Sequence, residues 1–163
     1  LEIFLPDLIM SADVAKAVKD EIRAHLLSSS NDSESAGKVA IGTVQGDVHD
    51  IGKNIVATLL EVNGYEVIDL GNDVAPYAFI ETAKRENVDI IALSSLLTTS
   101  MPYMVDVLKT MEGLGIRNQY KVIVGGGPVS AEWAESIGAD GYSNDANEAV
   151  ELCRKIMAER KAG

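Results

Sequence analysis

Basic residues are scarce in this chain of 163 residues, which has 14 lysines and arginines against 25 aspartates and glutamates. The formal net charge is -11. A surface of this sign repels phosphate backbones and anionic lipid headgroups, so we expect neither nucleic acid nor a membrane among the partners. The apolar runs also fall far short of the roughly 20 residues that a membrane-spanning helix needs. The composition therefore predicts a soluble protein.

Cysteine is nearly absent, since Cys153 is the only one, and this excludes a disulfide within the chain. Cys153 falls on the apolar face of the last expected helix, where we expect it to be a small core residue. No basic segment followed by an apolar stretch and a cleavage site opens the chain, which begins at Leu1. These features favour a cytoplasmic protein.

Two common phosphate-binding motifs are also missing. The sequence has no GxxxxGK[ST] motif, and no GxGxxG follows the first expected strand. A nucleoside triphosphate or a dinucleotide held in the usual way is therefore disfavoured as the ligand. Apolar residues nevertheless make up 47% of the chain, which is enough for a substantial core.

The amino-terminal part has the pattern of one helix followed by a linker. Pro6 suits a first helical turn, and an apolar stripe runs along residues 8–26. Residues 28–37 have no large apolar side chain and the composition of a flexible linker. We expect three parts: a helix within residues 1–27, a linker at 28–37 and a larger domain at 38–163. The apolar stripe needs a partner, so we expect a homodimer through this helix.

Strands and helices alternate through the rest of the chain. Apolar runs predict strands at residues 39–44, 65–70, 88–93, 120–124 and 139–143. Helices are expected at 53–63, 76–87, around 104–111, 130–137 and 145–160, the first with a buried face at Ile55, Val56, Leu59 and Leu60. This alternation is typical of a parallel sheet covered on both faces. The expected fold class is α/β, with a five-stranded parallel doubly wound sheet of flavodoxin-like order 2-1-3-4-5.

An imidazole and two carboxylates lie in the run 45–52, between the first strand and its helix. His49 can bind a metal through one ring nitrogen while the other donates a hydrogen bond to a carboxylate, which fixes the tautomer. Asp47 is the candidate for that carboxylate. The sequence leaves a second interpretation open, in which Asp47 caps the helix and His49 is a solvated loop residue.

Two more unusual segments follow the third and fourth strands. Residues 94–100 are rich in hydroxyl groups, and residues 125–127 are three glycines. Each has a purely local explanation: Ser94 satisfies backbone groups, Ser100 caps a helix and the glycines form a tight turn. In the order 2-1-3-4-5, however, all three loops reach one edge of the sheet. A single extended ligand, polar at one end, can then contact them together.

The three segments resemble the signature DxHxxG, SxL and GG of the cobalamin-binding domain of methionine synthase and of the small corrinoid proteins of anaerobic methyl transfer. Here they read DVHDIG at 47–52, SSL at 94–96 and GG at 125–126. The intervals between them, residues 53–93 and 97–124, suit that family. Cobalamin mutases usually carry arginine where Ile51 stands, so the methyltransferase branch is favoured.

The resemblance implies a role for each motif residue. His49 would be the lower axial ligand of cobalt, Asp47 would hold its other nitrogen, and Ser100 would extend this relay. Ser94 would contact the displaced benzimidazole base, and Leu96 would line the channel for the nucleotide tail. The residues expected to bind the cofactor are Gly46, Asp47, Val48, His49, Asp50, Ile51, Gly52, Ser94, Leu96, Thr98, Thr99, Gly125, Gly126 and Gly127.

The function that the resemblance implies is that of a corrinoid protein, which carries a methyl group on the cobalt of a cobalamin or related cobamide. Its expected partners are a substrate-specific corrinoid methyltransferase, a second methyltransferase that passes the methyl to a thiol or folate, and a reductive activation protein. The chain would be a carrier rather than a complete enzyme. Residues 1–27 would be the carboxyl-terminal part of a helical cap, and residues 38–163 a Rossmann-like domain. The alternatives are a cobalamin-dependent sensor or regulator, a detached mutase subunit and a cobamide store.

Overall fold

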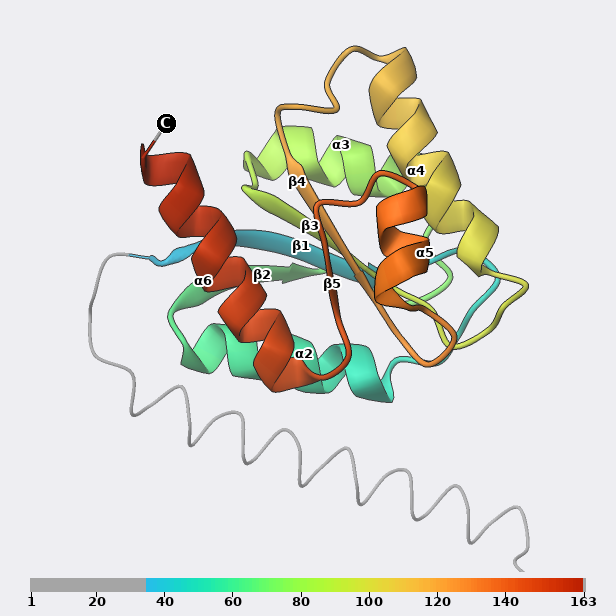
Figure 1. The fold of residues 1–163 in the computed structure, drawn as a ribbon, viewed down its shortest axis with the longest axis horizontal. Helices are drawn as coiled ribbons and strands as arrows, with labels where there is room; N and C mark the ends of the chain where they lie inside the picture. The colour runs from blue at the N-terminus through green and yellow to red at the C-terminus, as the bar shows by residue number, and fades with distance from the viewer. Residues whose placement is uncertain (1–34, 163) are drawn as a thin grey trace, which may run out of the picture. The chain divides into compact units, whose positions relative to one another are not determined.

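The strand order of the sheet places the loops of interest at one edge. The computed structural model describes residues 35–162, which contain five parallel strands in the order β2-β1-β3-β4-β5 (Figure 1). They are β1 (Gly37–Thr43), β2 (Tyr65–Asp69), β3 (Ile90–Ser94), β4 (Lys121–Gly125) and β5 (Gly141–Ser143). The expected fold class and strand order are confirmed. The order reverses between the neighbours β1 and β3, where ligands of such sheets bind.

The register aligns the carboxyl ends of four strands. Thr43 pairs with Ser94, Ser94 with Gly125, and Gly125 with Ser143. The loops that follow β1, β3, β4 and β5 therefore start at one level of the sheet. The predicted cap, its dimer contact and most of the predicted linker lie outside the described residues.

Helices cover both faces of the sheet. They are α2 (Ile51–Val62), α3 (Pro76–Glu86), α4 (Met101–Gly113), α5 (Ala131–Ser136) and α6 (Ala146–Ala162). Figure 1 shows α2 and α6 on one face, and α3, α4 and α5 on the other. Within the described residues, the expected strands and helices are all present, with ends shifted by at most three residues. In the part of the chain from 35 to 162, no helix is long and apolar enough to cross a membrane.

Two hydrophobic clusters, one on each face, hold the layers together. Because side chains of a strand alternate between faces, Ala40 belongs to the cluster beneath α3, α4 and α5, while its neighbours Val39 and Ile41 belong to the cluster beneath α2 and α6. Phe79 and Leu60 are fully buried in the two clusters. Each large side chain buried in this way contributes about 1.5–3 kcal/mol.

The predicted buried face of α2 was partly wrong. Leu60 is fully buried, but Ile55 is 51% exposed, and Ala57 is buried instead. The stripe of Ile55, Val56 and Leu59 borders a cavity described below. The reason is that α2 packs on the sheet through an adjacent stripe, which the sequence period alone does not distinguish from its neighbour.

Cys153 is buried on the inner face of α6, as predicted, together with Ala149, Val150 and Ile156. Burial raises the pKa of the Cys153 thiol to about 12. Because thiolates are the reactive form, the native protein should not react with a thiol-specific disulfide reagent near pH 8. Absorbance should show one reactive thiol per chain only after denaturation. Prompt labelling of the native protein would contradict the packing of α6.

Candidate functional site

The carboxylate of Asp47 joins two loops, the one between β1 and α2 and the one between β3 and α4. Its Oδ1 accepts hydrogen bonds from the backbone N–H of His49 at 2.9 Å and from Nδ1 of the same residue at 2.7 Å. Its Oδ2 accepts from the backbone N–H groups of Leu96 and Leu97 at 2.6 and 3.2 Å. The Asp47 side chain is fully buried. One side chain thus orients the imidazole and ties it to a second loop.

Two buried hydroxyls extend this arrangement. Ser100 Oγ donates to Asp47 Oδ2 at 3.3 Å, and Ser95 Oγ lies 2.7 Å from Ser100 Oγ. Ser100 holds the position before α4, as expected, but its side chain makes no capping hydrogen bond. The predicted grouping of Asp47, His49 and Ser100 is therefore present, and Ser95 is a further member that the sequence analysis missed.

The hydrogen bonds around Asp47 lower the pKa of its carboxyl group. Burial by itself would raise this pKa, but hydrogen bonds from the backbone and ring of His49 and from the N–H groups of Leu96 and Leu97 lower it from 3.8 to about 2. A carboxylate can only accept, so Nδ1 of His49 carries the proton of the pair. Among residues 35–162, the ring has a hydrogen-bond partner only at Nδ1.

His49 lies half-exposed on the loop between β1 and α2. Its side chain is 50% exposed, so Nε2 can be reached from outside. Its carbonyl accepts a hydrogen bond from the buried Thr43 Oγ1 at 3.1 Å, another contact that the sequence did not indicate. Asp50, not Asp47, holds the position before α2, and it makes no side-chain capping bond. The alternative in which Asp47 caps α2 is not the observed arrangement.

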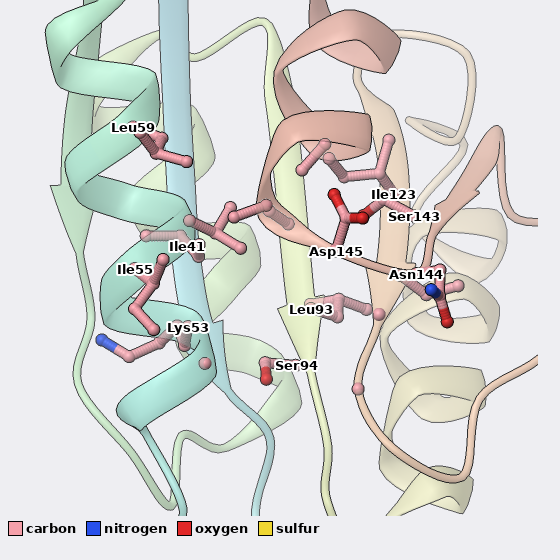
Figure 2. A pocket seen from close by; sticks show the side chains of 18 of the residues that line it. Ile41, Lys53, Ile55, Leu59, Leu93, Ser94, Ile123, Ser143, Asn144 and Asp145 are labelled. Atoms are coloured by element: carbon pink, nitrogen blue, oxygen red, sulfur yellow. The ribbon is translucent and has the colours of Figure 1, made fainter.

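A cavity of about 450 Å³ lies beside this group, over β1, β3 and β4. Figure 2 shows it between α2 and the turn that leads from β5 into α6. Its walls are mainly apolar, with Ile41, Leu59 and Ile123 among them, while Ser94 adds a hydroxyl group. Lys53 also borders the cavity, but its amino group is paired with Asp69 of β2. The site offers a deep apolar space with polar groups at its edges.

The glycines at the end of β4 and just after it lie where backbone segments approach closely. Gly126 has φ +122, and a Cβ placed there would lie 1.8 Å from the carbonyl oxygen of Ser95. A Cβ on Gly125 would lie 3.1 Å from the carbonyl oxygen of Ser143. Both glycines border the cavity, whereas Gly127 does not. A Cβ on Gly127 would meet the side chain of Leu96 at 3.0 Å.

The remaining predicted residues lie around His49 or on the neighbouring loop. Val48 and Ile51 are 66% and 78% exposed. Leu96 is exposed as well and is not among the residues that border the cavity, so its predicted channel contact is not seen. Thr98 and Thr99 are exposed on the same loop. Gly52 borders the cavity, and Gly46 takes a left-handed conformation with φ +80.

Replacing Gly126 by alanine tests the close approach of the two loops. We expect Gly126→Ala to lower the free energy of unfolding by roughly 2–3 kcal/mol, because the new methyl group overlaps a backbone oxygen. Gly138→Ala is the control, since Gly138 also has positive φ, at +76, but open space around it. The unfolding free energy of this control should fall by only about 1 kcal/mol. If urea denaturation shows equal losses for Gly126→Ala and Gly138→Ala, the steric explanation is wrong.

The depressed pKa of Asp47 predicts a pH dependence of stability. The folded-state value of about 2 lies below the ordinary 3.8, so the stabilisation is complete above the ordinary value and declines as the pH falls toward 2. From about pH 6 to about pH 3, the wild type should lose about 1 kcal/mol more unfolding free energy than Asp47→Asn. Urea denaturation at both pH values measures this difference. Parallel losses in the two proteins would contradict the assigned hydrogen bonds.

The cofactor class follows from comparison with known proteins. A family model described as "B12 binding domain" matches residues 37–151. A corrinoid protein of Desulfitobacterium hafniense (strain Y51) is 44% identical over 162 residues, which cover 97% of this chain and 74% of the relative. This match extends across the three loops and the sheet that carries them.

Solved structures show the same likeness. The Methanosarcina barkeri monomethylamine corrinoid protein superposes with a TM-score of 0.78 and 34% identity, covering 95% of this chain and 73% of that one. A chain of the methanol:cobalamin methyltransferase complex from Methanosarcina barkeri gives a TM-score of 0.72 and 34% identity, covering 96% of this chain and 58% of that one. With the Asp47–His49 pair, the glycine turn and the cavity in place, this chain belongs to the family of B12-binding corrinoid proteins.

Proposed function

We propose that this protein is the corrinoid subunit of a methyltransferase system and carries a methyl group on the cobalt of a bound cobamide. The observation that carries the proposal is the hydrogen-bonded pair of Asp47 and His49 at the switch point of the sheet, beside an apolar cavity. The bound cobalt would supply the chemistry, by holding and releasing the methyl group. The residues of this chain would bind and orient the cofactor and hold a proton.

His49 is the candidate ligand of cobalt. Because Nδ1 is occupied by Asp47, Nε2 is the nitrogen left for a metal. Among residues 35–162, no group of three or more His, Cys, Asp and Glu side chains could together hold a metal ion. A single imidazole suits a metal whose equatorial positions are filled by a macrocycle.

The cavity fits the nucleotide tail of a cobamide. Its volume of about 450 Å³ lies in the usual range for small-molecule sites. The apolar wall suits a flat aromatic base, and Ser94 offers it a hydroxyl group. The backbone at Gly125 and Gly126 carries no side chain that would obstruct the tail. Displacement of the lower base into this cavity would leave the cobalt free for His49.

Exposed apolar side chains next to His49 support contact with the corrin ring. Val48 and Ile51 lie on the loop of His49, and Leu96 and Leu97 lie on the loop that Asp47 attaches to it; all four are exposed. Large apolar side chains gathered in this way mark a binding surface. Thr98 and Thr99 would add polar contacts at its edge.

Asp47 and His49 can also hold a proton whose binding depends on the metal. With Nε2 bound to cobalt, the neutral ring would donate a hydrogen bond from Nδ1–H to Asp47. Without that metal bond, Nε2 would be open to a proton, and the Asp47 carboxylate lies where it would stabilise a charged ring. The hydroxyls of Ser100 and Ser95 lie 3.3 and 3.5 Å from Asp47 Oδ2, where they can donate to it and help it remain ionised. Binding of His49 to the metal is therefore coupled to protonation.

The partners follow from the carrier role. We propose a substrate-specific methyltransferase that loads the methyl group, a second one that passes it to a thiol or folate, and a reductive activation protein, all meeting the carrier in the cytoplasm. Similarity to the methylamine and methanol proteins supports the first of these. Residues 1–27 would complete a helical cap ahead of a linker at 28–37 and the cofactor domain at 38–163, or pair two copies of the chain.

Replacement of His49 tests the assignment of the metal ligand. Reconstituted with cobalamin and reduced by one electron, the wild type should show one nitrogen coupled to cobalt in its electron spin resonance spectrum. Histidine labelled with the heavy nitrogen isotope should change that splitting, because the nitrogen belongs to the protein. His49→Ala should lose the labelled signal, while His25→Ala, which removes the other histidine, should keep it. If the splitting of the wild type is the same with labelled and unlabelled histidine, the cobalt-bound nitrogen does not come from the protein. That result would refute His49 as the ligand.

A further inference from the structure

The connection between β2 and α3 reaches the His49 loop from the side opposite Leu96 and Leu97, because β2 and β3 flank β1 in the sheet. Asp73 makes two contacts there. Its Oδ1 accepts a hydrogen bond from the backbone N–H of Gly46 at 2.7 Å. Its own N–H donates to the carbonyl oxygen of Asp47 at 2.9 Å. One residue thus holds the backbone of two successive loop positions.

The backbone of Asp73 is unusual in a way that fits this contact. Its φ is +52, in the left-handed region, which residues other than glycine rarely occupy. Aspartate and asparagine are the side chains that tolerate this region best. Gly46, its partner, has φ +80. The two loops therefore meet through two left-handed residues.

The other hydrogen bonds of this connection go mainly to Thr43, at the end of β1. Val74 N–H donates to the Thr43 carbonyl at 3.0 Å, and Thr43 N–H donates to Gly71 at 3.0 Å. Asn72 reaches the Val48 carbonyl only at 3.5 Å. Among the described residues of this connection, only Asp73 forms hydrogen bonds with the backbone of Gly46 and Asp47. Its loss would leave the register of the strands intact and release the loop.

We propose that Asp73 is a positioning residue, which sets the direction of the His49 imidazole toward the cofactor; the proposal rests on the function proposed above. The Asp47 carboxylate is fixed from one side by the N–H groups of the β3–α4 loop. The Asp47 backbone is fixed from the other side by Asp73. With both ends of Asp47 held, Nδ1 of His49 has a stationary acceptor, and Nε2 points in one direction. The bond to Gly46 needs an acceptor oxygen, not a charge.

Three substitutions separate the acceptor from the backbone conformation. Asp73→Asn keeps an acceptor oxygen and tolerates positive φ, so it should bind cobalamin and ligate it as the wild type does. Asp73→Gly keeps the backbone conformation but loses the bond to Gly46. Asp73→Ala loses both. We expect the glycine and alanine variants to bind cobalamin roughly 10-fold more weakly, with a smaller fraction of cobalt coupled to the labelled histidine nitrogen.

The cofactor-free protein gives a second measurement. Amide hydrogen exchange at Gly46 and His49 should be faster in Asp73→Gly than in the wild type, with no change in the strands β1, β3 and β4. If Asp73→Ala fails to fold, the glycine variant still provides this test. Unchanged exchange at both residues in Asp73→Gly would count against the proposal.

Asn87 provides a matched control for loss of stability. It is the other described non-glycine residue with positive φ, at +51, and it lies after α3, at the amino end of β3 and away from the site. Asn87→Ala should be destabilised by its backbone, as Asp73→Ala is, yet keep the wild-type fraction of histidine-ligated cobalt. Wild-type ligation and affinity in Asp73→Gly would overturn the proposal, and so would an equal loss in Asn87→Ala. If the wild type itself lacks the labelled nitrogen signal, the proposed function has failed instead.

Discussion

A buried carboxylate surrounded by N–H and O–H donors is the interaction on which the site depends. A charge without water is costly unless it is well hydrogen-bonded, and the donors to Asp47 come from two loops that are far apart in the sequence. Satisfying it therefore requires the β1–α2 loop and the whole β3–α4 loop, up to Ser100 before α4, to be in place together. The hydrogen bonds that orient His49 are therefore the same ones that hold the two loops in their folded positions.

The sheet was predictable because its determinants are local. Apolar runs and helical periods identify the elements, and a parallel sheet of order 2-1-3-4-5 brings the three loops to one edge. The exposure of Ile55 was not predictable, because periodicity does not tell which of two adjacent stripes packs on the sheet. Ser95, Thr43 and Asp73 were missed for another reason: their roles arise from contacts with the His49 loop, which only the register of the strands creates.

The two faces of the sheet differ in how completely helices and side chains fill them. Beneath α3, α4 and α5 lies the larger hydrophobic cluster, with Phe79 and Met104 fully buried in it. The other face is packed near the amino ends of the strands but opens between α2 and α6 toward their carboxyl ends, where the cavity lies. A well-packed face can hold the strands rigid while the opposite face leaves space for a ligand.

The glycine at position 126 also constrains how the sequence can change over time. A Cβ on Gly42 would meet the ring of Phe79, and one on Gly141 would meet the side chain of Leu152, so a smaller partner could restore the fit in either case. At Gly126 the obstacle is a main-chain oxygen, which is the same whatever residue occupies position 95. No second substitution can compensate there. Divergent descendants of this chain can therefore exchange the pairs at 42 and 79 or at 141 and 152, but they must retain glycine at 126.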